Sequence, residues 1–144
     1  MELNLIYPPL LGIFGLVVAL LLFMLVMRYD GGSDEVKKIG DQIHLGAMVF
    51  MRREYTYLAL FVSVLIVLSY IFLGFNTALA VTAGALSSSL AGWLGMFAAT
   101  KANVRTATAA SQEGAQSALS VAFYGGSIMA VSYTHLTLPT IREV

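Results

Sequence analysis

The acidic residues near the start of the chain come nearest to the spacing that metal chemistry needs. They are Asp30, Asp34, Glu35 and Asp41. Phosphate chemistry with Mg²⁺ requires several carboxylates close together, to hold the metal and activate water. Lysines are interleaved with these carboxylates, and Asp34 and Lys38 have the i,i+4 spacing of an ion pair on a helix surface. We therefore interpret this group as a solvated helix surface and not as a metal site.

The remaining candidates for chemistry are isolated. His44 and His135 lie far apart and lack a cluster of further ligands, so His44 is interpreted as the polar flank of a surface helix. The glycine pairs at residues 31–32 and 125–126 do not follow a strand, as a phosphate loop requires, and indicate turns or helix packing. We predict no catalytic, cofactor-binding or metal-binding residue in this chain.

The composition is that of a membrane protein. Of 144 residues, 58% are hydrophobic and only 11% are charged, whereas soluble domains carry about 25% charged residues. So few charges cannot cover a water-facing globule, and a lipid bilayer is the expected surrounding. The net charge is zero, so the basic field typical of nucleic-acid binding is missing. The lack of cysteine excludes disulfides and thiolate metal sites.

The first expected transmembrane helix covers residues 10–27, which carry no charge. At about 1.5 Å per residue this helix is roughly 27 Å long, close to the hydrocarbon thickness of about 30 Å. Pro8 and Pro9 stand at its start, where prolines are tolerated, and Arg28 ends it. A signal peptide would have a basic start and a shorter apolar run, so we interpret the segment as a retained anchor.

Residues 55–100 contain no charge and are about twice as long as one span requires, which predicts a hairpin of two helices. We place these spans at residues 55–73 and 78–99, with the turn at residues 74–77. The bulky second span is expected to face lipid. The third span carries small residues at four-residue spacing, which allow close helix packing in membranes: Gly84, Ser88 and Gly92, and Ala91, Gly95 and Ala99.

A fourth apolar stretch covers residues 118–131 and is too short for a convincing span. Polar residues and Pro139 follow it, so we expect a truncated fourth helix. Residues 103–116 are rich in Ala, Thr and Ser and predict a polar helix or loop at the surface. The fold class is therefore an all-α membrane protein, a helical bundle with three clear transmembrane helices and an incomplete fourth.

An amphipathic helix is expected on the cytoplasmic side over residues 33–50. Ser33 can cap it, and acidic residues follow at the positive end of its dipole. Its apolar stripe consists of Val36, Ile39, Ile43, Ala47 and Phe50. This helix can lie on the membrane surface or pack on the bundle. A solvated connector that extends the next span inward is an equally open alternative.

Charged residues flank the three clear spans but do not enter them. An ionisable residue within a span would indicate a transport site. Glu54, at the inner edge of the second span, is interpreted as a partner of Arg52 or Arg53 and not as a proton carrier. Basic residues mark cytoplasmic loops, and they are Arg28, Lys37, Lys38, Arg52, Arg53, Lys101 and Arg105. This predicts an outside N-terminus and an outside hairpin tip.

Several stretches resemble the membrane-bound inorganic pyrophosphatases that pump protons or sodium. Residues 46–50 (GAMVF) with residues 53–55 (REY) resemble the family's GAMAFL..EY segment. Residues 99–107 (ATKANVRTA) resemble its ATxANVRTA stretch, and residues 122–129 (AFYGGSIM) resemble its AFRGGAVM segment. The ANVRT run is the most specific, and the three matches occur in the family's order and spacing. The resemblance covers residues 1–131.

The resemblance implies a multi-pass enzyme in a prokaryotic cell membrane that hydrolyses pyrophosphate with Mg²⁺, in some members with K⁺ as an activator, and moves H⁺ or Na⁺. It also implies a homodimer of long chains, in which the first helices form an outer ring. The catalytic residues of the family lie on inner helices later in the chain. No catalytic residue is therefore carried over to any position here, and the chain is expected to be an inactive N-terminal fragment.

The tail, residues 132–144 (SYTHLTLPTIREV), does not match the apolar continuation of the family. We interpret it as an artefact, namely translated adapter sequence joined to a gene fragment. The alternative to a pump fragment is a complete small membrane protein, either a non-enzymatic scaffold or a small multidrug transporter. Such transporters need a carboxylate within the first span, and residues 10–27 have none. The family motifs favour the pump fragment.

Overall fold

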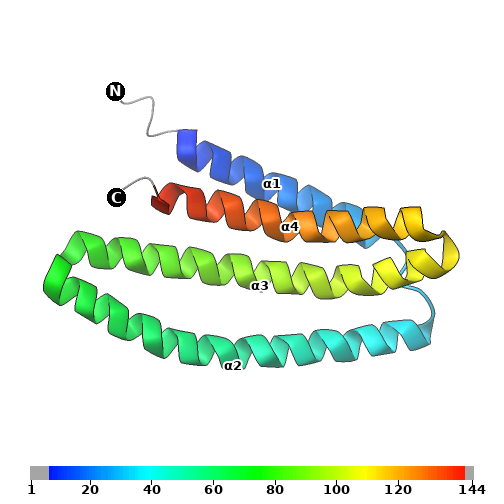
Figure 1. Cartoon of the computed structure of the whole chain (residues 1–144), viewed down its shortest axis with the longest axis horizontal. Coiled ribbons are helices and arrows are strands. Elements are labelled where there is room, and N and C mark those ends of the chain that lie inside the picture. The colour runs from blue at the N-terminus through cyan, green and yellow to red at the C-terminus, as the bar shows by residue number, and fades with distance from the viewer. Residues whose placement is uncertain (1–6, 142–144) are drawn as a thin grey trace.

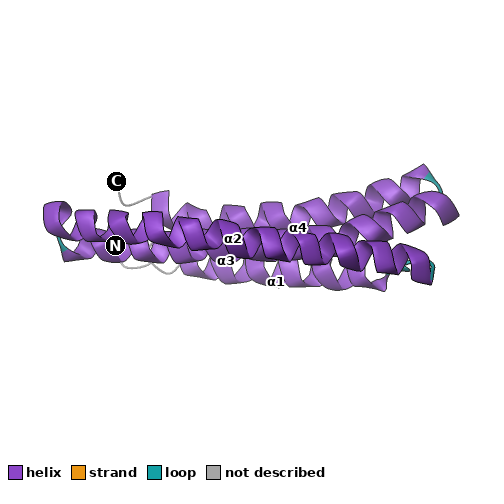
Figure 2. Ribbon diagram, turned by 90° about the horizontal axis from the view of Figure 1, so that it is seen from below, coloured by secondary structure: helices purple, strands orange, loops and turns teal. Residues whose placement is uncertain are grey.

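The chain folds into four antiparallel α-helices. The structure, a computed structural model, describes residues 7–141, with side chains for residue 10 and residues 12–131. The helices are α1 (Tyr7–Arg28), α2 (Asp34–Leu73), α3 (Phe75–Gln112) and α4 (Ala115–Ile141). They pack in the order α2, α3, α4, α1, and they run along one long axis with no strand in the described part (Figures 1 and 2). The predicted all-helical bundle is confirmed.

Two of these helices, α2 and α3, are long and apolar enough to cross a membrane. The described apolar parts of the other two, Gly12–Arg28 in α1 and Ala115–Val131 in α4, are shorter. Length and composition thus support the second and third predicted spans. The span at residues 10–27 stays a prediction.

Helix α2 is a single helix of 40 residues, about 60 Å long at about 1.5 Å per residue and so twice the hydrocarbon thickness of about 30 Å. Ser33 caps it as predicted, because its Oγ accepts a hydrogen bond from the Val36 backbone N–H at 3.4 Å. The expected amphipathic segment and the second span are therefore continuous. The segment extends the second span, as the connector alternative expected, and it also packs on the bundle, as the first alternative allowed.

The predicted apolar stripe of this segment coincides only in part with the face that packs. Val36 and Ala47 are half-buried, whereas Ile39 and Ile43 are more than half exposed, and Gly40 and Met51 are buried instead. The stripe was chosen by helical spacing, but contact between α2 and α3 depends on close approach. Gly40 lies directly against the Val104 side chain, where an added Cβ would collide. Small residues therefore decide which face of α2 packs.

The turn between α2 and α3 is tighter than predicted. Gly74 is the only residue between the two helices, and α3 begins at Phe75 instead of after residue 77. Gly74 has φ 91° and ψ 175°, a combination that is essentially restricted to glycine. As expected, the bulky side of α2 faces away from the bundle, and Phe72 is 78% exposed.

Small residues of α3 form its seam with α4. The buried members on α3 are Ala91, Gly95, Ala98, Ala102 and Ala109. The expected close packing of this span is thus confirmed for Ala91 and Gly95, while Ser88 is exposed. Such packing suits a membrane, where association depends on van der Waals contact and not on hydrophobic burial.

The second half of the chain agrees with one expectation and differs from another. Residues 103–116 are helical as far as Gln112, and most of them are exposed, although Thr108 and Ala109 are buried. Helix α4 is not broken by polar residues, since it continues through Pro139 to Ile141. Pro139 lacks the N–H that would bond the carbonyl four residues before it, and only two residues of α4 follow it.

Candidate functional site

The acidic residues that the sequence groups together have separate structural roles. Asp30 Oδ1 accepts a hydrogen bond from the Gly32 N–H at 3.1 Å, which shapes the turn before α2. Asp34 pairs with Lys37 at 4.0 Å on an exposed surface. The predicted partner, Lys38, was therefore wrong by one position. Within the described side chains, no three His, Asp or Glu residues gather as metal ligands would.

Asp41 forms a link between helices. Its Oδ1 lies 3.5 Å from Lys101 Nζ on α3. Lys101 is only 29% exposed, whereas Asp41 is 76% exposed, so the pair borders solvent and contributes little to stability. The pair shows that the two predicted cytoplasmic segments lie at the same end of the bundle.

His44 was predicted to be the polar flank of a surface helix, and this prediction is wrong. Its Nδ1 lies 2.7 Å from Thr100 Oγ1 on α3, and its ring meets Phe97 edge-on at 5.1 Å. The Thr100 hydroxyl is also within hydrogen-bond distance of the Phe97 carbonyl at 2.9 Å. A hydroxyl has one hydrogen, so when it bonds that carbonyl, His44 Nδ1 is the donor. His44 therefore joins α2 to α3.

Tyr55 forms a second polar link between the same helices. Its hydroxyl donates to the Ser89 carbonyl at 2.7 Å. The missing side chain at Gly92 makes room for it, since a Cβ there would lie 2.8 Å from the Tyr55 oxygen. The expected pairing of Glu54 with a neighbouring arginine is wrong, because among described residues no cation lies within 4.0 Å of its carboxylate.

These two links could have been found from the sequence by one further step. Helices joined by a tight turn place residues at similar distances from that turn opposite each other. His44 and Thr100 lie at similar distances from Gly74, and so do Tyr55 and Ser89. The step was missed because residues 33–50 were treated as separate from the second span. His135 lies outside the described side chains.

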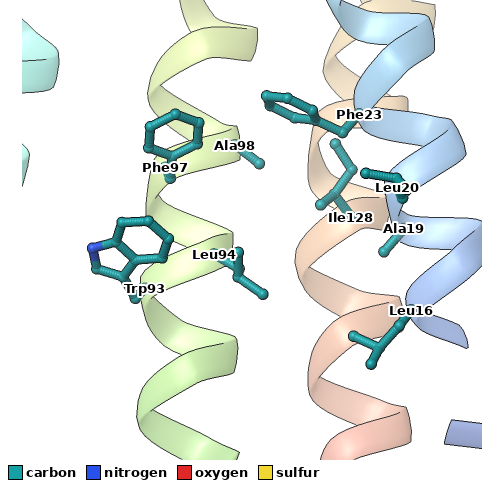
Figure 3. Close-up of a pocket in the computed structure, with 9 residues that line it drawn as sticks. All are labelled: Leu16, Ala19, Leu20, Phe23, Trp93, Leu94, Phe97, Ala98 and Ile128. Carbon is teal, nitrogen blue, oxygen red and sulfur yellow. The ribbon is translucent and has the colours of Figure 1, made fainter. Parts of the chain in front are cut away.

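An apolar pocket of about 260 Å³ opens between α1, α3 and α4. Leu20 and Phe23 line it from α1, and Leu94 and Ala98 of α3 point toward them, with Phe97 beside Ala98 (Figure 3). Trp93 and Phe97 stack with ring centroids 5.6 Å apart. All of the lining side chains are hydrophobic, so the pocket offers shape and apolar contact but no group for acid–base or nucleophilic chemistry.

Comparison with known proteins identifies a family and several relatives. The family described as "Inorganic H+ pyrophosphatase" matches residues 13–143, which takes in most of the segment assigned above to a foreign tail. A relative in Clostridium tetani is 40% identical over 129 residues, which are 90% of this chain and 19% of the relative.

Two further relatives are named as pumps of different ions. The "K(+)-insensitive pyrophosphate-energized proton pump" of Methanosarcina mazei is 38% identical over 96% of this chain and 21% of its own length. The "K(+)-stimulated pyrophosphate-energized sodium pump" of Thermotoga maritima is 38% identical over 76% of this chain and 15% of its own length. The chain thus spans about a fifth or less of these relatives. Because the family match covers nearly all of the sequence, the chain belongs to the inorganic H⁺ pyrophosphatase family.

Proposed function

We propose that the chain is the N-terminal part of a membrane pump that couples hydrolysis of inorganic pyrophosphate to translocation of H⁺ or Na⁺. The observation that carries the proposal is the family match over residues 13–143. Relatives of this stretch are named as pyrophosphate-energized pumps. Since the chain spans only 19–21% of its more fully aligned relatives, we assign hydrolysis and pumping to the parent protein.

Within that pump the four helices act as structural support around a catalytic core formed by later residues. The separate structural roles of Asp30, Asp34 and Asp41 favour this assignment. We therefore expect membrane vesicles that contain only the 144-residue chain to hydrolyse no more pyrophosphate than vector-control vesicles. The full-length parent serves as positive control. Hydrolysis by the short chain above the vector level would contradict the assignment.

The parent pump is expected to require Mg²⁺ and to acidify vesicles or load them with sodium. Proton- and sodium-named relatives match at the same 38% identity, so we assign the choice of ion and any activation by K⁺ to residues beyond this stretch. Pyrophosphate hydrolysis that survives EDTA would contradict the Mg²⁺ requirement. Vesicles assayed with a pH dye and with radioactive sodium, each with and without K⁺, distinguish the possible pumps.

The proposed setting is a prokaryotic cell membrane with the N-terminus outside. The α1–α2 loop and the α3–α4 turn lie at one end of the bundle, and the α2–α3 turn lies at the other (Figure 1). Lys101 and Arg105 of α3 join Lys37 at the first of these ends, as basic cytoplasmic segments should. A reporter fused near Asn76 should prove external, and a cytoplasmic reporter would overturn this orientation.

The proposed partners are the remaining helices of the parent chain and a second copy of it. Large exposed hydrophobic side chains on α2 and α3, such as Leu60, Phe61 and Leu86, leave apolar surface for such helices or for lipid. The purified parent in mild detergent should have the mass of a homodimer, measured by light scattering with the detergent subtracted. A monomeric mass with intact hydrolysis would contradict the dimer.

We also propose that residues 132–144 are foreign, although the family match extends to residue 143. The proposal rests on the polar tail that follows the apolar stretch at residues 118–131. Genomic DNA amplified across this junction should encode a different, apolar continuation. Recovery of the same SYTHLTLPTIREV codons from the genome would refute it.

A further inference from the structure

The seam between α1 and α3 carries two pockets in succession. The first is the apolar pocket of Figure 3, which Leu16, Leu20 and Phe23 of α1 line together with Trp93 and Phe97 of α3. Helix α1 packs mainly on α4 and touches α3 only slightly. The slight contact between α1 and α3 leaves room for these pockets along the seam.

The second pocket, also about 260 Å³, follows toward the α1–α2 loop. Met27 lines it from α1, and Lys101 and Arg105 line it from α3. Lys37 and Asp41 of α2 and Thr100 of α3 complete its polar lining. Asp41 pairs with Lys101 at 3.5 Å, and Asp34, outside the lining, pairs with Lys37 at 4.0 Å. Among the described residues, Arg105 is therefore the lining cation without a carboxylate partner.

Arg105 enters this second pocket with unused hydrogen-bonding capacity. One of its terminal nitrogens donates to the Lys101 carbonyl at 2.9 Å. Its Nε is buried, and among the described residues it has no acceptor. A buried donor without a partner is costly, and guanidinium groups match phosphate oxygens in geometry and charge. A phosphate group in the pocket would therefore bond to the terminal nitrogens of Arg105, since Nε itself is buried.

The two pockets share the same helix faces. On α1, Leu16, Leu20, Phe23 and Met27 follow one another at helical spacing from the apolar pocket into the basic one. The span from Leu16 to Met27 is about 17 Å at about 1.5 Å per residue, close to half of the hydrocarbon thickness of about 30 Å. The apolar pocket and the basic pocket thus lie one after the other on the same helix faces, over about the depth of one leaflet.

We propose that this seam binds one anionic phospholipid, with its phosphate on Lys101 and Arg105 and one acyl chain along Leu20, Phe23 and Phe97. A free phosphate ion would use only the basic pocket, and a later helix of the parent would use only the apolar pocket. Basic pockets between membrane helices suit anionic headgroups, which are enriched in the cytoplasmic leaflet. This proposal rests on the proposed location in a membrane but not on pyrophosphate hydrolysis. Hydrolysis is measured in a separate assay, so failure of the lipid site and failure of the proposed function can be distinguished.

The test is native mass spectrometry of the full-length parent pump, titrated with phosphatidylglycerol and, for comparison, with neutral phosphatidylcholine. Lys101→Gln and Arg105→Gln should each weaken retention of phosphatidylglycerol about fivefold, from the typical strength of a basic residue near an anionic lipid surface. Lys38→Gln is the matched control, because Lys38 is exposed at the same end but does not line the pocket. Arg105→Lys should retain most of the binding.

The apolar half of the site is tested by filling the apolar pocket. Leu20→Trp should reduce retention of the lipid, while Leu21→Trp should not, since Leu21 is comparably exposed on α1 but lies outside the pocket. The melting temperature of each variant shows that the pump remains folded. Weaker lipid retention in Leu20→Trp but not in Leu21→Trp, together with weaker retention in Lys101→Gln and Arg105→Gln, would support the lipid site.

Three other results would overturn the proposal. Equal retention of both lipids, or charge variants without effect, would show that the basic pocket does not select an anionic lipid. Displacement of the lipid by millimolar inorganic phosphate, with Leu20→Trp silent, would indicate a site for the free anion. Loss of assembly in Leu20→Trp but not in Leu21→Trp would mean that a later helix of the parent fills the apolar pocket.

Discussion

The adjacent glycines at 125 and 126 on α4 allow a matched test of the α3–α4 seam. Gly125 is buried, and a Cβ added there would lie 2.5 Å from Ala102 Cβ on α3. Gly126 is exposed, and a Cβ added there would meet no atom within 4 Å. Substitution of each glycine by alanine therefore changes the same helix by the same methyl group, but only one of the two methyl groups points into the seam.

The expected difference follows from two opposing effects. Either substitution gains about 1 kcal/mol of helix propensity, because glycine is the poorer helix former. Gly125→Ala also overpacks the seam, which typically costs about 1–3 kcal/mol. The upper part of that range applies, because the opposing Ala102 Cβ is attached directly to its backbone and cannot rotate away. The propensity gain is the same in both variants, so Gly125→Ala should be about 2–3 kcal/mol less stable than Gly126→Ala.

The assay is unfolding of the chain in mixed detergent micelles with increasing SDS, followed by helical circular dichroism. Gly126→Ala should be as stable as the unchanged chain or more stable. Addition of Ala102→Gly to Gly125→Ala removes the opposing methyl group and should recover most of the lost packing. The double-mutant cycle isolates this contact from the separate effects of the two substitutions.

Equal unfolding midpoints for the two glycine variants would refute the reasoning, since the seam would then not be in contact at Gly125. The same conclusion would follow if Ala102→Gly failed to recover stability in the Gly125→Ala background. Either result would mean that α3 and α4 pack in another register.

Three further predictions concern the contacts between α2 and α3 and use the same unfolding assay. Tyr55→Phe removes the hydroxyl that donates to a backbone carbonyl of α3 at 2.7 Å, and it should lower the free energy of unfolding by about 1 kcal/mol. Tyr57→Phe, at an exposed tyrosine, should leave the stability unchanged. Equal effects of the two substitutions would refute the Tyr55 contact. His44→Phe and Thr100→Val should show a coupling of about 1 kcal/mol in a double-mutant cycle, because their side chains meet at 2.7 Å, and strict additivity would contradict that contact. Gly74→Ala should destabilise the hairpin by about 1–3 kcal/mol, because φ 91° is strained for alanine, and an unchanged unfolding midpoint would mean that the turn is not so tight.

Much of the helical architecture was predictable from local properties of the sequence. Residues 55–100 carry no charge, and Gly74 marks a turn near their middle. These two features were sufficient to predict the hairpin of α2 and α3. Ser33 before two acidic residues was sufficient to predict the start of α2. These predictions succeeded because a bilayer requires every backbone group to bond within its own helix, so that apolar length and turn residues decide where helices lie.

The faces that pack were not predictable in the same way. Hydrophobic spacing selected Ile39 and Ile43, but α2 packs through Gly40 and Met51. Size and register between partners decide such contacts in a membrane protein, because lipid competes for large apolar side chains as well as protein does. The partner residues lie far away in the sequence, as Val104 does for Gly40, and only the arrangement of the helices brings them together.

Family membership and the composition of a membrane protein were thus contained in the sequence, in the ANVRT run at residues 102–106 and in the scarcity of charge. Only the tertiary structure shows that the arginine of this run, Arg105, lines a pocket together with Lys101 and Lys37. This pocket follows the apolar pocket along the same helix faces. The physical reason is that a pocket belongs to no single helix. It forms where α1, α2 and α3 leave a space between them, and its charge depends on which faces the packing of small residues turns toward that space.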